Sequence, residues 1–427
     1  MKNMTLWIAA FATLSSGLLR AQDIAVDWQG EAGRYRYVLH VTKPGSGGGN
    51  PTLTMIDQHL DWEGALPVTS LSLESSKLKF STEDPDASYE GEVSADGTSI
   101  AGTWRQGPPQ KLQFVRATKE TEWRDESPHS VQFINVDHDV KLEVLDWGGP
   151  GRPLVLLSGL GNTAHIFDQF APKLTATYHV YGITRRGFGE SSHPRSGYIA
   201  DRLGDDVLAV IDALKLNRPV IAGHSIAGEE LSSIGSRHPE RVAGLIYLEA
   251  GYPYAYYDHA RGDFAIDLGE LRRKLEEMEF GRLPQDPRPL VQEVLENTLP
   301  AFERDLRELQ KSMVATPPPA SAGAPPRPAF APAAIIEGQR KYSDVRAPIL
   351  AIYALPHAPP AAIRNNPEAV AKADARDEAS TGAQAKAFEA GLPSARVVRL
   401  AHASHYVFLS NESDVLREMN AFIGSLP

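Results

Sequence analysis

From Ser130 onward, short runs of continuous apolar residues alternate with helix-like patterns, and this rhythm restricts the possible folds more than any other feature. The runs are Pro153–Leu157, Tyr178–Ile183, Pro219–Ala222, Val242–Leu248, Ile349–Tyr353 and Arg396–Leu400. A strand that is apolar at every position must be buried on both faces, and strands separated by helices usually pair in parallel. Residues 130–427 are therefore predicted to form an α/β domain with a mostly parallel sheet covered by helices.

The preceding residues, 22–120, have the pattern of a small antiparallel all-β domain. Polar and apolar residues alternate through several short segments, and Asp96-Gly97 lies between the strand-like segments Tyr89–Val93 and Ser99–Trp104. Asp-Gly between two such segments is a strong hairpin signal. We expect an accessory domain, and its role as a structural module or as a ligand-binding or attachment domain stays open at this point.

Residues 1–21 resemble a secretory signal peptide. Lys2 provides a positive start, and the apolar run Trp7–Leu19 precedes small and polar residues. This run is shorter than the roughly 20 residues that span a bilayer, although a short membrane anchor is the alternative. We therefore expect export to the periplasm or the extracellular medium, with no membrane span after removal of the signal.

Charge and cysteine content exclude several kinds of function. The formal net charge is −11, and removal of residues 1–21, which contain Lys2 and Arg20 but no acid, makes the chain more negative. Such a balance disfavours nucleic acids and anionic membranes as partners. The chain has no cysteine, so disulfides and a thiol nucleophile are excluded.

One connection in the predicted sheet is much longer than the others and is predicted to form a cap. Between Leu248 and Ile349 lie helical patterns at Leu268–Phe280 and Leu290–Met313, followed by the proline- and alanine-rich stretch Thr316–Ala334, which predicts irregular structure. Helices inserted after a strand of a parallel sheet suggest a cap at about 251–343. A second, polar insertion runs from Ala358 to about Ala379.

The segment Pro219–Gly228 contains the motif that carries the most chemical information. An apolar strand leads directly into Gly223-His224-Ser225-Ile226-Ala227, and a helical pattern follows. This resembles the nucleophile elbow of the α/β-hydrolase family, in which small flanking residues permit a strained turn. The resemblance, which covers about residues 130–427, implies that Ser225 is the nucleophile. The alternative is a serine that caps a helix after a strand.

Two other segments match the family in order. Ser158-Gly159-Leu160 follows an earlier strand, although Ser158 stands where the family usually has histidine. The resemblance implies that the backbone amides of Leu160 and Ile226 form an oxyanion hole. The segment Thr184–Ser191 matches a loop of the family except at Thr184, which replaces an aspartate, and we interpret it as structural.

The family's catalytic histidine lies in the loop after the last strand, which here contains His402 and His405. His405 is followed by Tyr406-Val407-Phe408 and matches the family pattern better. The resemblance therefore implies that His405 is the general base, with His402 as the alternative.

The position of the acid departs from the commonest family pattern. After the penultimate strand, where most members have aspartate, this chain has His357. Some members carry the acid one strand earlier, and Glu249 ends an apolar strand there. A charged residue at that place needs a partner or a function. We predict Glu249 as the acid that orients His405, and the alternatives are Asp374, Asp377 and Glu378.

Together these residues predict a Ser–His–acid hydrolase that forms an acyl-enzyme. Because most of the family acts on esters, the expected substrate is a small carboxylic ester, and no metal or organic cofactor is implied. The alternatives are a lyase or a carbon–carbon hydrolase of the same fold, or a binding protein that has lost activity. Epoxide and haloalkane hydrolysis are disfavoured, because those relatives need an aspartate in place of Ser225.

Overall fold

The structure is a computed structural model that describes residues 24–32, 35–41, 51–57, 62–83, 86–106, 109–118, 128–279, 281–315, 330–360 and 363–427. The chain divides into two compact units, one of Met1–Met55 with Ala65–Trp123 and the other of Ile56–Gly64 with Arg124–Pro427. The predicted signal peptide, residues 1–21, lies outside the described residues.

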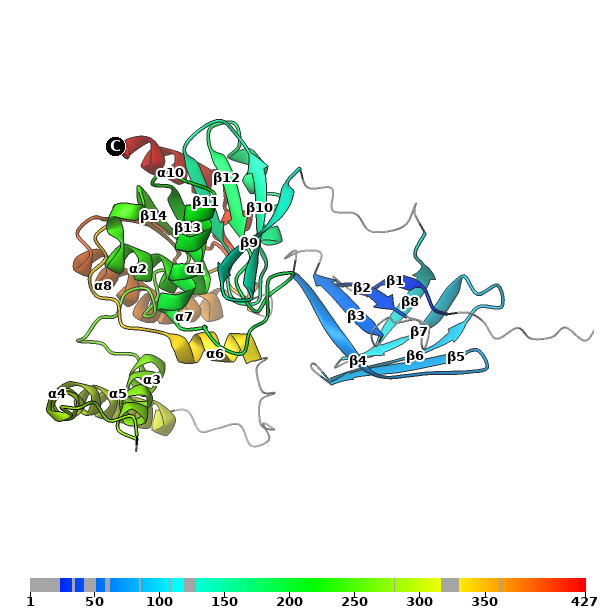
Figure 1. The fold of residues 1–427 in the computed structure, drawn as a ribbon, viewed down its shortest axis with the longest axis horizontal. Helices are drawn as coiled ribbons and strands as arrows, with labels where there is room; N and C mark the ends of the chain where they lie inside the picture. The colour runs from blue at the N-terminus through cyan, green and yellow to red at the C-terminus, as the bar shows by residue number, and fades with distance from the viewer. Residues whose placement is uncertain are drawn as a thin grey trace, which may run out of the picture. The chain divides into compact units, whose positions relative to one another are not determined.

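The N-terminal unit is a closed antiparallel barrel (Figure 1). Its strands are β1 (Asp27–Ala32), β2 (Tyr35–His40), β3 (Thr52–Asp57), β4 (Trp62–Glu74), β5 (Lys77–Glu83), β6 (Asp86–Val93), β7 (Ser99–Arg105) and β8 (Gln110–Arg116). Trp28, Tyr89 and Trp104 are among the large side chains that fill its interior. The hairpin predicted at Asp96-Gly97 joins β6 to β7, and Gly97 has the positive φ of 67° that such a turn requires.

The C-terminal unit is built on an eight-stranded sheet in the order β16-β15-β14-β13-β11-β12-β10-β9. Its strands are β9 (Ser130–Asp137), β10 (Val140–Gly148), β11 (Pro153–Leu157), β12 (His179–Ile183), β13 (Val220–His224), β14 (Gly244–Leu248), β15 (Ile349–Ala354) and β16 (Ala395–Leu400). Strands β11 to β16 pair in parallel, whereas the hairpin β9–β10 joins the edge in antiparallel orientation. The predicted fold class is therefore confirmed for both parts of the chain.

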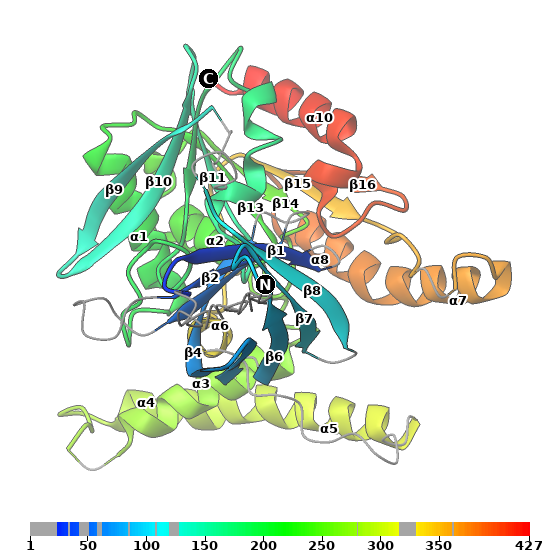
Figure 2. The same cartoon turned by 90° about the vertical axis from the view of Figure 1, so that its right-hand side faces the viewer.

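Helices cover both faces of this sheet, as the continuous apolar strands require. Successive residues of β11 point to opposite faces, so that Val155 and Leu154 belong to different apolar clusters. The helices on the Val155 face are α1 (Ala200–Ala213), α2 (Gly228–Arg237) and α8 (Ala383–Gly391). The helices on the opposite face are α9 (Val407–Ser410) and α10 (Glu412–Ser425). Figure 2 shows α1 and α2 well separated from α10.

The long connection between β14 and β15 contains the predicted cap helices. They are α3 (Phe264–Glu277), α4 (Arg288–Glu293), the π-helical turn η5 (Val294–Thr298), α5 (Leu299–Ala315) and α6 (Phe330–Gly338). In Figure 1, α3, α4 and α5 form a group distinct from the helices that cover the sheet.

The start of α6 corrects one expectation, because the predicted irregular stretch Thr316–Ala334 is wrong for Phe330–Ala334. Pro332 lies in the first turn of α6, where a missing amide hydrogen costs no helical hydrogen bond. Residues 316–329 lie outside the described part of the chain. The second insertion contains α7 (Pro367–Asp377) and the π-helical turn η6 (Glu378–Gly382), which lead into α8. None of the described helices is long and apolar enough to cross a membrane.

Candidate active site

Ser225 lies on a strained turn between β13 and α2. It begins the short 3₁₀ helix η3 (Ser225–Ala227) and has a φ of 53°, a left-handed conformation that is unusual for a residue other than glycine. The residues that flank Ser225 are small for a steric reason. A Cβ atom added at Gly223 would lie 2.9 Å from the Cβ of Ala227, and one at Gly228 would lie 2.1 Å from the carbonyl oxygen of Ala250. The turn therefore places the hydroxyl of Ser225 beyond the end of the strand.

His405 lies in the loop after β16 and is in hydrogen-bond contact with Ser225. Its Nε2 lies 2.9 Å from Ser225 Oγ. The alternative residue, His402, is exposed and has a φ of 57° at the start of the same loop. Burial lowers the pKa of His405, and the positive charge of His357 acts in the same direction, although Glu249 opposes both. A histidine with a lowered pKa is neutral at pH 7 and free to accept a proton.

His224, in the elbow itself, fixes the backbone of the histidine loop. It is 1% exposed, and its Nε2–H donates to the carbonyl oxygen of His405 at 3.0 Å. Burial, together with the nearby His405, lowers the pKa of His224 to about 3, so its ring is neutral. No local sequence pattern signals this role, because the contact of His224 with a residue so far along the chain is set by the fold.

Glu249 follows β14 and is completely buried, with a φ of 51°. One carboxylate oxygen of Glu249 and one ring nitrogen each of His357 and His405 all lie within 4.8 Å of one another. Its carboxylate accepts hydrogen bonds from the Tyr252 hydroxyl, the Ala354 amide and His357 Nε2. The structure therefore brings Glu249 close to His405, while the hydrogen bonds described for its carboxylate go to these other groups.

His357 occupies the place after the penultimate strand where an aspartate was expected, and it bridges two carboxylates. Its Nε2 lies 3.1 Å from Glu249 Oε1, and its Nδ1 lies 2.8 Å from Asp377 Oδ2. The backbone amide of His357 also donates to Asp377 Oδ2 at 2.7 Å. Because ionised carboxylates only accept hydrogen bonds, both ring nitrogens carry protons. The hydrogen bond to Glu249 is the main cause that raises the pKa of His357 to about 9.

The three alternative acids are placed differently by α7 and the turn that follows it. Asp377 is partly buried and contacts His357, which in turn contacts Glu249. Burial opposes ionisation of Asp377, but the hydrogen bonds from His357 hold the pKa of this carboxyl below its usual value. Asp374 is half-buried, and Glu378 is exposed and paired with Lys386 at 2.7 Å. The position of His357 in the sequence was the one available signal for this arrangement.

The segments that carry Leu160 and Ile226 are brought together by the sheet. Strands β11 and β13 are parallel neighbours, with Leu157 opposite Gly223, so the chain leaves both strands at the same edge. Ile226 belongs to an apolar cluster beneath the cap, and Leu160 packs against that cluster. The two predicted amide donors thus belong to adjacent turns.

Side chains hold the turn that contains Leu160. Ser158, which replaces the family's histidine, donates from Oγ to the carbonyl oxygen of Asn162 at 3.0 Å. Arg185 donates to the carbonyl oxygen of Ser158 at 2.9 Å and to Glu230 Oε2 at 2.7 Å. The loop Thr184–Ser191, interpreted from the sequence as structural, therefore stabilises this turn through Arg185.

The tyrosines that follow Glu249 divide between the site and the cap. Tyr252 donates to Glu249. Burial raises the pKa of Tyr254, and its hydrogen bond with Ser225 acts in the opposite direction. Tyr257 instead donates to the carboxylate of Asp267 in α3 at 2.7 Å. Tyr252 and Tyr254 thus lie beside the reactive groups, whereas Tyr257 connects to the cap.

A mostly parallel sheet, a serine on a strained strand–helix turn and a histidine from the loop after the last strand together define an α/β-hydrolase fold. The chain belongs to the alpha/beta hydrolase family, whose family model matches residues 154–418.

Known proteins similar to this chain include the AB hydrolase superfamily protein YisY of Bacillus subtilis, which is 34% identical over 133 residues (29% of this chain and 49% of that protein). The non-heme chloroperoxidase of Streptomyces lividans is 36% identical over 142 residues (30% of this chain and 51% of that protein). The chain thus spans about half the length of these relatives. Among solved structures, the esterase RhEst1 from Rhodococcus sp. ECU1013 is 18% identical with a TM-score of 0.45, covering 70% of this chain and 100% of that chain.

Proposed function

We propose that this protein is a serine hydrolase that cleaves small carboxylic esters through an acyl-enzyme. The observation that carries the proposal is the 2.9 Å contact between His405 Nε2 and Ser225 Oγ at a strained strand–helix turn. A hydroxyl within hydrogen-bond reach of a neutral imidazole is the arrangement that activates serine for attack on a carbonyl. The ester is chosen by analogy with the family as a whole.

In the first step, His405 accepts the proton of Ser225 as its oxygen attacks the carbonyl carbon. The resulting oxyanion binds to the backbone amides of Leu160 and Ile226, each worth roughly 3 kcal/mol in the transition state. His405 then donates the proton to the departing alcohol. In the second step, water that has lost a proton to His405 releases the acid and restores Ser225.

Glu249 acts in this mechanism as the acid that stabilises the imidazolium of His405 and selects its tautomer. His357 and Asp377 position Glu249 from its other side. The 3.1 Å and 2.8 Å contacts of His357 form a chain from Glu249 to Asp377, which holds a buried carboxylate in one orientation. A buried carboxylate without polar partners is costly, and these contacts supply such partners to Glu249.

Export is the second part of the proposal. Residues 1–21 direct the chain out of the cytoplasm and are then removed, which places the enzyme in the periplasm or the extracellular medium. N-terminal sequencing of the protein recovered outside the cytoplasm tests this, with a new N-terminus near Gln22 as the expected result. A chain that retains residues 1–21 at a membrane would contradict it and favour the anchor.

Labelling with a fluorophosphonate, followed by a screen of esters of increasing acyl length, tests the chemistry. Ser225→Ala is expected to abolish both labelling and ester turnover, with little change in thermal midpoint. Ser236→Ala is the matched control, because Ser236 lies in α2 and its Oγ donates to the backbone carbonyl of Asp344. Unchanged labelling of Ser225→Ala would refute the proposal, and product analysis separates hydrolysis from a lyase reaction.

A further inference from the structure

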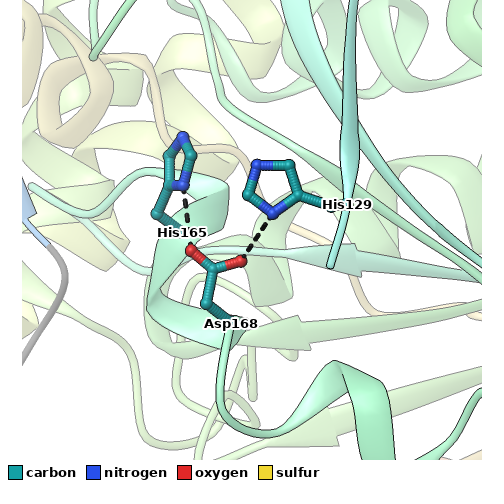
Figure 3. A group of neighbouring side chains, drawn as sticks. All are labelled: His129, His165 and Asp168. Atoms are coloured by element: carbon teal, nitrogen blue, oxygen red, sulfur yellow. Dashed lines mark hydrogen bonds and ion pairs between the residues drawn. The ribbon is translucent and has the colours of Figure 1, made fainter. Parts of the chain in front are cut away.

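A second group of titratable side chains lies away from Ser225, in the first part of the C-terminal unit. His129 directly precedes β9, His165 lies in the short 3₁₀ helix η1 (Ala164–Phe167), and Asp168 follows that helix. Figure 3 shows both imidazole rings turned toward the single carboxylate of Asp168. One donor atom from each residue lies within 4.8 Å of the others.

The distances between these donor atoms suit a metal ion. His129 Nδ1 lies 3.0 Å from Asp168 Oδ1, and His165 Nδ1 lies 2.9 Å from Asp168 Oδ2. Ligand atoms bonded to zinc at 2.0–2.2 Å in a tetrahedral arrangement are separated by about 3.4 Å, so a separation larger by about half an ångström would let these atoms share one ion. The ring centroids of the two histidines are 5.1 Å apart, so their nitrogens approach Asp168 from different directions.

The far side of His165 has the support that metal-bound histidines usually have. Its second nitrogen, Nε2, lies 3.6 Å from Glu143 Oε1. Glu143 Oε2 in turn accepts a hydrogen bond from the Thr184 hydroxyl at 2.6 Å. A carboxylate on the second nitrogen fixes the tautomer and the ring orientation of a ligating histidine.

Burial and charge also favour a divalent cation. The side chains of His129, Asp168 and Glu143 are 3%, 12% and 5% exposed. A divalent ion held by neutral imidazoles would balance the negative charges of Asp168 and Glu143. Imidazole with carboxylate suits zinc and its transition-metal neighbours better than calcium or magnesium, which prefer oxygen alone.

We propose that His129, His165 and Asp168 bind one divalent transition-metal ion of the zinc class. Three protein ligands leave the remaining positions of the metal to water. The ion would join the segment before β9 to the β11–β12 connection. That connection also carries Leu160, so the metal would stabilise the region behind the proposed oxyanion turn.

The same side chains also form a charge network without a metal, and this is the rival explanation. Burial alone would lower the pKa of His165, but its hydrogen bonds to Asp168 and Glu143 outweigh burial and raise the pKa to about 10. A metal must therefore displace a proton from His165, and its affinity should fall as the pH decreases.

The test uses the whole purified protein after dialysis against EDTA, with zinc chloride added and bound zinc measured by mass spectrometry and titration calorimetry. The expected result is about one zinc ion per chain, which also raises the thermal midpoint. Asp168→Asn and His129→Gln are each expected to weaken binding at least about tenfold. Using two variants keeps the test valid if one of them fails to fold by circular dichroism.

Two control variants locate the bound ion. His138→Gln should keep full binding, because His138 is 92% exposed and contacts only the neighbouring turn residue Asp139 among the ion pairs described. His357→Gln should also keep it, whereas zinc held by Glu249, His357 and His405 would be lost. No zinc bound by the wild type, binding retained by both Asp168→Asn and His129→Gln, or binding lost in His357→Gln would each overturn the proposal.

Discussion

Replacement of Glu249 by glutamine removes one charge from the candidate site and keeps the size of the side chain. A carboxylate oxygen of Glu249 lies within 4.8 Å of a ring nitrogen of His405. At an effective dielectric constant of about 20, opposite unit charges at that distance attract by about 3.5 kcal/mol, which corresponds to about 350-fold in rate. The loss of tautomer control extends the expected decrease toward about 10⁴-fold, the value for the analogous aspartate of another serine hydrolase. The positive charge of His357, left without Glu249, acts in the same direction.

The assay is steady-state turnover of one soluble ester by the wild type and by Glu249→Gln, with circular dichroism to show that the fold is kept. Asp374→Asn and Glu378→Gln are the matched controls, because both carboxylates lie in the second insertion, where Asp374 is half-buried and Glu378 is exposed. They should lose less than about tenfold. If Glu249→Gln stays within tenfold of the wild type, the carboxylate does not stabilise His405, and the reasoning is refuted.

The pKa of His357 is raised to about 9, so this residue is positively charged at neutral pH and opposes the protonation of His405. His357→Gln should therefore move the acidic limb of the pH–rate profile to higher pH. An unmoved limb would exclude this coupling. The pKa of His224 is lowered to about 3 in the folded chain, so between about pH 6.5 and 3 the unfolded chain binds a proton that the folded chain does not. The contribution of neutral His224 to stability is therefore complete above pH 6.5 and is lost as the pH falls toward 3. Urea denaturation of His224→Phe should therefore show a pH dependence shallower by about 1.4 kcal/mol per pH unit in that window, and parallel curves would contradict this. Gly228→Ala places a Cβ 2.1 Å from the carbonyl oxygen of Ala250 and should destabilise the fold by about 1–3 kcal/mol. The control Gly424→Ala places a Cβ with nothing within 4 Å and should not destabilise the fold. Equal thermal midpoints of the two variants would show that the backbone at Gly228 shifts without cost. A shortened chain that begins near Glu122 should fold and turn over a small ester, and its failure would mean that the barrel is needed by the hydrolase unit.

The sequence alone predicted the features that depend on local patterns. Continuous apolar runs must be buried on both faces, so they predicted the strands and the layered α/β fold. The small residues around Ser225 predicted the strained turn, since only small side chains avoid the close contacts at Gly223 and Gly228. The resemblance of short motifs at the strand ends to the α/β-hydrolase family implied Ser225, Glu249 and His405.

The tertiary structure decided which distant groups meet, because local patterns do not specify the order of strands or the packing of insertions. Strand β14 lies between β13 and β15, which brings Glu249 toward His357, and α7 then places Asp377 on the other side of that ring. The group formed by His129, His165 and Asp168 likewise depends on the path of the β11–β12 connection. Local propensity assigned Phe330–Ala334 to an irregular stretch, but packing of Ala331 and Ile335 against the core made it helical. In the folded chain, burial lowers the pKa of His224 and His405 and keeps both neutral, whereas the hydrogen bonds to Glu249 and Asp377 raise the pKa of His357 and keep it charged.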